Sequence, residues 1–128
     1  MLFDIAIAKN FQIIPEYHIA GWSLDFLITG ILKTGEHANI CVEFKHAHNP
    51  KLVDGLIKQL PAYMKSKGCD FGVYCVLYFK GKYFDEPRGY DDPDKLKLYL
   101  NNQAVSAGIT NIRVLIIDLS HPKPPSQL

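Results

Sequence analysis

The stretch FGVYCVLYF at residues 71–79 constrains the fold more than any other part of this sequence, because its only polar groups are tyrosine hydroxyls. A strand that is apolar on both faces must be covered on both faces, which is typical of a central strand in a layered α/β protein. The segment IRVLIIDL at residues 112–119 is also mostly apolar and predicts a second buried strand. The two runs together predict a sheet with other layers packed against it.

A β-hairpin is predicted ahead of these strands. The segments SLDFLITGIL (23–32) and HANICVEFKH (37–46) are both rich in apolar residues. Between them, residues 33–36 read KTGE and supply turn chemistry, with Gly35 free to adopt a positive φ.

Two helices complete the predicted domain. Asn49 is expected to cap the first helix with Pro50 in its first position, and Gly68 is expected to end it. The second helix is expected to begin at Asp92 or Asp94, after a loop rich in Gly, Asp and Pro (81–93). The order hairpin, helix, strand, helix, strand predicts an α/β domain with a mixed β-sheet flanked by helices.

The 128 residues are enough for one hydrophobic core, so we expect a single domain over residues 1–120. The remaining segment, HPKPPSQL at 121–128, is expected to be a flexible tail. Near the other end, the run FQII (11–14) is expected to break at Pro15.

Composition indicates a globular protein of the cytoplasm. No run approaches the roughly 20 apolar residues that cross a bilayer, so no membrane association is expected. The start MLFDIAIAKN lacks the basic lead of a signal peptide. Three cysteines without CxxC spacing favour reduced thiols. The net charge of +1 does not by itself indicate a polyanion partner, although residues 45–88 hold eight bases and four acids.

The hairpin brings an acid on its first strand close to an acid and a base on its second. Antiparallel partners have a constant sum of residue numbers, and Asp25 opposite Glu43 gives a turn centred on residue 34. Asp25 opposite Lys45 gives a turn centred on residue 35. Both centres fall in the predicted turn, and Glu43 and Lys45 share one strand face.

Two neighbouring carboxylates repel each other unless a cation lies between them, and Mg²⁺ takes one or two carboxylates plus waters. We therefore expect Asp25 and Glu43 to bind a divalent cation, with the backbone carbonyl of Phe44 as a further ligand. Lys45 could then orient water or stabilise charge on a phosphate. A plain cross-strand ion pair explains the same three side chains. Asp25, however, is the only charged residue between positions 17 and 32, and a charge in so apolar a strand is costly unless it is paired or bound to a ligand. On the hairpin alone, both interpretations stay open.

An acid, a tight turn and then apolar-Glu-x-Lys, followed by a helix and an apolar strand, resembles the PD-(D/E)XK nuclease superfamily. The motif residues here are Asp25, Glu43 and Lys45. Gln59 and Tyr63 are four apart on the following helix and match the Gln-xxx-Tyr motif of the lambda-exonuclease and RecB-like branch.

The resemblance implies a restriction-endonuclease-like fold and Mg²⁺-dependent hydrolysis of DNA to a 5′-phosphate and a 3′-hydroxyl, with Mn²⁺ as a substitute metal. It implies that Asp25 and Glu43 hold the metal and that Lys45 helps to activate water. Gln59 would position the water or the phosphate, and Tyr63 would contact substrate. Restriction, defence, recombination and repair all remain open as settings.

The sequence departs from the family pattern in its first helix, which is hardly present, and in Pro61, which should kink the motif helix. Glu16 could replace the acid of that first helix, and His46 or His48 could face substrate. A homo-oligomer or a larger protein assembly could complete the site. Two alternatives stay open: an inactive nuclease-fold module that binds nucleic acid, and a protein-interaction module.

Overall fold

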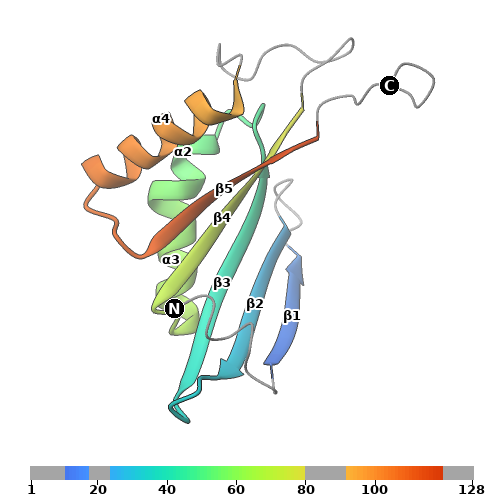
Figure 1. Ribbon diagram of the computed structural model, residues 1–128, viewed down its shortest axis with the longest axis vertical. Coiled ribbons are helices and arrows are strands. Elements are labelled where there is room, and N and C mark those ends of the chain that lie inside the picture. The colour runs from blue at the N-terminus through green and yellow to red at the C-terminus, as the bar shows by residue number, and fades with distance from the viewer. Residues whose placement is uncertain (1–10, 18–23, 80–91, 120–128) are drawn as a thin grey trace, which may run out of the picture.

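The computed structural model describes residues 11–17, 24–79 and 92–119. They form one five-stranded sheet in the order β1-β2-β3-β4-β5 (Figure 1). Its strands are β1 (Phe11–Tyr17), β2 (Leu24–Ile31), β3 (His37–His46), β4 (Phe71–Tyr78) and β5 (Ile112–Asp118).

The sheet is mixed. The pairs β1–β2 and β2–β3 are antiparallel, whereas β3–β4 and β4–β5 are parallel. The parallel pairs need crossover connections, and the two helical segments of the chain provide them. The predicted α/β class, the hairpin and both strand positions are therefore confirmed, and β4 is buried as predicted. The prediction of a buried strand at residues 112–119 is wrong: β5 is at the edge of the described sheet, and its Leu115 and Ile117 side chains are each 37% exposed.

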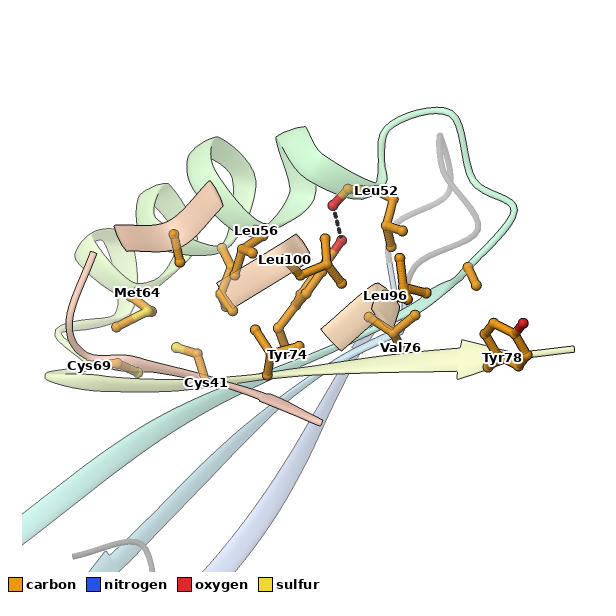
Figure 2. Close-up of a cluster of buried hydrophobic side chains, with 14 residues drawn as sticks. Cys41, Leu52, Leu56, Met64, Cys69, Tyr74, Val76, Tyr78, Leu96 and Leu100 are labelled. Carbon is orange, nitrogen blue, oxygen red and sulfur yellow. Dashed lines mark hydrogen bonds between the residues drawn. The ribbon is translucent and has the colours of Figure 1, made fainter. Parts of the chain in front are cut away.

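Both helical segments cover the same face of the sheet (Figures 1 and 2). On that face, Cys41, Tyr74 and Val114 join a core with buried leucines from the helices. Ile40 and Val42, whose side chains alternate with Cys41, belong to a separate cluster on the opposite face. The odd-numbered residues of β3 from Cys41 onward therefore point toward the helices.

The first helical segment runs without interruption through α2 (Leu52–Asp54), a π-helical turn η1 (Gly55–Gln59) and α3 (Leu60–Lys67). It begins at Leu52, two residues later than predicted. The Asn49 side chain still helps to form the turn before the helix, because its Oδ1 accepts a hydrogen bond from the backbone N–H of Lys51 (2.8 Å). Gly68 ends the helix in the left-handed conformation (φ 67°), as predicted.

The second helix, α4 (Pro93–Ser106), is capped by Asp92, whose side chain accepts a hydrogen bond from the backbone N–H of Asp94 (2.7 Å). This decides between the two predicted starts. Most of the loop predicted at 81–93 and all of the predicted tail lie outside the described residues, as does the start of the predicted 1–120 domain.

The prediction that Pro15 breaks the first apolar run is wrong. β1 continues through Pro15, which pairs with Phe26 of β2. β1 is at the edge of the described sheet, and an edge strand tolerates proline because one side of its backbone makes no ladder bonds. Among the described residues, no helix is long and apolar enough to cross a membrane.

Candidate functional site

The hairpin register places Asp25 of β2 directly opposite Glu43 of β3. Of the two registers that the turn allowed, the structure adopts the one centred on residue 34. Gly35 takes the required positive φ of 87° in that turn. Directly opposed residues point to the same face, so the two carboxylates lie together on the helix-covered side of the sheet.

Lys45 lies two residues along the same strand and shares this face. Asp25, Glu43 and Lys45 are the buried charged residues of the described chain, with exposed fractions of 5%, 4% and 4%. We call these three side chains the charged trio. A buried charge is costly unless it is paired, hydrogen-bonded or bound to an ion, so the burial of all three makes their mutual arrangement energetically important.

The Lys45 ammonium is held from two sides. Its Nζ lies 3.3 Å from Glu43 Oε1, within one strand. It also donates a hydrogen bond to Oε1 of Gln59, which is on the helix above the sheet. Gln59 is itself an exposed residue. The trio is therefore buried, but it is connected to the surface through the Gln59 amide.

Gly55 allows the helix to lie this close to Lys45. A Cβ added at residue 55 would fall 2.8 Å from Lys45 Nζ and 3.1 Å from its Cδ, and it would also collide with the Tyr74 hydroxyl. The Tyr74 hydroxyl donates a hydrogen bond to the carbonyl of Leu52 (2.6 Å), which joins the helix start to β4 (Figure 2). Neither Gly55 nor Tyr74 was predicted as a site residue, although a glycine within a helical pattern is a signal of close packing.

The π-helical turn also explains how the chain accommodates Pro61. The backbone N–H of Leu60 bonds to the carbonyl of Gly55, five residues back, instead of four. Proline lacks an N–H and its ring crowds the carbonyl four residues earlier in a regular α-helix. The turn directly before Pro61 is wider than an α-helical turn, and the helix continues through Pro61 into α3.

The donor set fits a small divalent cation. Two carboxylates and one ammonium leave the trio with one negative charge, and Mg²⁺ binds one or two carboxylates with water completing its shell. Within residues 11–17, 24–79 and 92–119, no group of three or more His, Cys, Asp or Glu side chains is arranged to hold a metal. A set of two carboxylates suits Mg²⁺ with several retained waters better than a closed protein cage.

Three other residues were predicted to contact substrate, and they lie in different parts of the fold. Tyr63 packs against the helix-side core, with Lys67 Nζ 6.0 Å from its ring centroid. His46 follows Lys45 and so points to the opposite face, where its ring is 5.6 Å from that of Phe79. His48 is exposed in the turn after β3. The contact of these three residues with substrate stays a prediction.

The predicted substitute acid Glu16 and the predicted metal ligand Phe44 are placed by the backbone register alone. Glu16 of β1 pairs with Asp25, so Glu16, Asp25 and Glu43 occupy one row across three neighbouring strands. Phe44 follows Glu43 in β3, where it pairs with Leu24 of β2 and with Cys75 of β4. Its carbonyl as a metal ligand stays a prediction.

The fold and the site define an α/β protein with a mixed sheet and a buried acid–acid–lysine trio under its first helical segment. By sequence comparison, the chain belongs to the family described as Domain of unknown function (DUF8371), whose profile matches residues 1–81. The matched part contains the trio, Gly55 and Gln59, whereas α4 and β5 follow it. Comparison with curated proteins finds no match.

Proposed function

We propose that this protein is a Mg²⁺-dependent nuclease that hydrolyses phosphodiester bonds in DNA. The observation that carries the proposal is the charged trio itself: Asp25 lies opposite Glu43, and Lys45 lies between Glu43 and Gln59. Two carboxylates with a lysine beside them suit a phosphate substrate, because they combine a cation site with a donor for a phosphate oxygen.

In this proposal Asp25 and Glu43 would hold the cation, and a bound cation would supply positive charge to the phosphate and make water more acidic. Lys45 donates hydrogen bonds to the attacking water or to a phosphate oxygen as negative charge develops. Gln59 fixes the ammonium and, because it is exposed, reaches the side from which substrate arrives. A bond forms between the water oxygen and phosphorus, and the bond to the 3′-oxygen breaks. The attacking water releases a proton to solvent and the 3′-oxygen takes one from solvent, which leaves a 3′-hydroxyl and a 5′-phosphate.

Burial supports a catalytic arrangement more than a surface ion pair. Exposed cross-strand pairs contribute little to stability, whereas burying three charges with one net negative charge is costly without a further cation. The unfavourable burial would be offset at a site where a divalent cation and a phosphate bind and bring the net charge close to zero.

The test is cleavage of plasmid and single-stranded DNA with Mg²⁺, Mn²⁺, Ca²⁺ or EDTA. We expect cleavage in Mg²⁺ and Mn²⁺, and a loss of about 100-fold or more in Glu43→Gln and in Lys45→Met, since each group would contribute a few kcal/mol to the transition state. Matched controls are Glu36→Gln and Lys33→Met, which make the same changes at exposed positions in the hairpin turn.

Cleavage that persists unchanged in both site variants would refute the mechanism. DNA binding without cleavage, with binding that survives Lys45→Met, would instead indicate an inactive nuclease-fold module. No DNA association at low salt, where phosphate contacts are strongest, would favour a protein-interaction module.

A further inference from the structure

We infer that Gly55 and the π-helical turn that it begins are a positioning device for the Lys45 ammonium. Its use in catalysis rests on the proposed function, but the positioning itself does not. Gly55 would set how far the ammonium extends under the helix, and Gln59 at the other end of the same turn would hold it there.

The first observation is the space that Gly55 leaves. Residue 55 is buried, and the place where a side chain would begin is already occupied by the Lys45 side chain and the Tyr74 hydroxyl. The conflict at Lys45 involves Cδ (3.1 Å) as well as Nζ (2.8 Å). A change of the terminal rotamer alone therefore cannot relieve it, and an added methyl group would displace the end of the lysine.

The second observation is the geometry of the turn. In η1 the hydrogen bond from the Leu60 N–H returns to the Gly55 carbonyl across five residues. Gly55 and Gln59 are four residues apart, and residues at this spacing lie on one side of a helix. Both therefore reach the same ammonium, Gly55 by leaving room and Gln59 by accepting a hydrogen bond.

The third observation is that the arrangement is anchored independently of Lys45. The Tyr74 hydroxyl bonds to the Leu52 carbonyl three residues before Gly55. This bond joins the start of the helix to β4 without using the lysine.

A structural role alone predicts that Gly55→Ala only loosens packing, and Gly72→Ala provides a matched control for that effect. Gly72 is buried in β4, and a Cβ there would fall 2.6 Å from Met64 Sδ. It pairs with Cys41, away from the charged trio. Both variants add one methyl group to a crowded buried glycine, but only Gly55→Ala conflicts with Lys45.

The direct test measures proton exchange of the Lys45 ammonium by nitrogen-15 NMR, with its signal assigned from its absence in Lys45→Ala. A hydrogen bond to a charged group corresponds to at least about a tenfold change in an opening equilibrium. We therefore expect exchange in Gly55→Ala to be about tenfold faster than in wild type, and unchanged in Gly72→Ala. Equal exchange in wild type and Gly55→Ala, or an equal acceleration in Gly72→Ala, would overturn the inference.

Melting temperatures give a second test that needs no lysine signal. Removing the lysine side chain removes the conflict with its Cδ and Nζ, and adding Glu43→Gln removes the acid–acid repulsion that the missing ammonium would leave. Gly55→Ala should therefore lower the melting temperature less in the Glu43→Gln/Lys45→Ala background than in wild type, and a Gly55→Ala protein that folds only in that background counts as the larger loss in wild type. An equal or larger loss in the Glu43→Gln/Lys45→Ala background would overturn the inference.

Cleavage kinetics separate this inference from the proposed function. If the protein is a nuclease, Gly55→Ala should lower kcat about tenfold while KM for DNA changes by no more than about twofold, because the ammonium moves and the binding surface stays. A loss confined to KM would contradict positioning. Wild-type protein without cleavage, but with the expected ammonium exchange, would refute the nuclease proposal and leave the positioning role supported.

Discussion

Replacing Lys45 with methionine should strongly destabilise the protein in the absence of metal, because it leaves two buried carboxylates side by side. Lys45 Nζ is 3.3 Å from Glu43 Oε1. At an effective dielectric constant of about 20, that pair attracts by about 5 kcal/mol. Asp25 and Glu43, at the roughly 5 Å spacing of cross-strand neighbours, repel by about 3 kcal/mol.

The methionine side chain recovers some packing and spares the desolvation of an ammonium. The expected net loss is therefore about 3–5 kcal/mol, as is usual when one partner of a buried pair is removed. Adding Glu43→Gln to Lys45→Met removes the acid–acid repulsion, and we expect it to restore about 2–3 kcal/mol of the loss. A divalent cation should also restore stability in Lys45→Met, by about 2.7 kcal/mol at 100 times its dissociation constant.

The assay is urea unfolding followed by far-ultraviolet circular dichroism, with and without Mg²⁺. Lys33→Met is the control, since this lysine is exposed and its loss should cost less than about 0.5 kcal/mol. Two results would refute the reasoning: a Lys45→Met protein within about 1 kcal/mol of wild type, or a double variant no more stable than the single one.

Three further predictions concern other parts of the fold. Gly68→Ala should cost about 1 kcal/mol in urea unfolding, because φ is 67° there and no atom lies near enough to add a packing effect; no loss would contradict this helix end. Tyr74→Phe should cost about 1–2 kcal/mol by leaving the Leu52 carbonyl without its donor, and thermal unfolding within error of wild type would argue against that bond. Burial raises the pKa of the Cys75 thiol above 9.0, so the folded state keeps a proton that the unfolded chain loses. This contribution is complete below pH 9.0 and is lost as the pH rises through the folded pKa. Unfolding titrations of Cys75→Ala above pH 9 should therefore show a weaker fall in stability, and an unchanged slope would exclude the effect.

The strand and helix order could be read from the sequence because it depends on local features. Apolar runs predicted β4 and β5, KTGE predicted the turn, and Gly68 predicted a helix end. The turn also limited the hairpin to two registers, in which Asp25 faces either Glu43 or Lys45 of β3.

Local patterns were less informative where two segments contact each other. The helix began at Leu52 because the Asn49 side chain made a turn before the first helical residue. Pro15 remained within a strand because β1 is an edge of the described sheet. Whether an edge exists at a given segment depends on the whole strand order, which no nearby residues encode.

For the candidate site, the sequence by itself determined the chemistry: two acids and a lysine at hairpin spacing, with a glutamine on the next helix. The tertiary structure decided whether Asp25 faces Glu43 or Lys45, and how the lysine is held. It paired Asp25 with Glu43, and it brought the helix over Lys45 closely enough that residue 55 has no room for a side chain. The physical reason is that residue type sets what a group can donate or bind, whereas the packing of a helix on a sheet sets the distances between such groups.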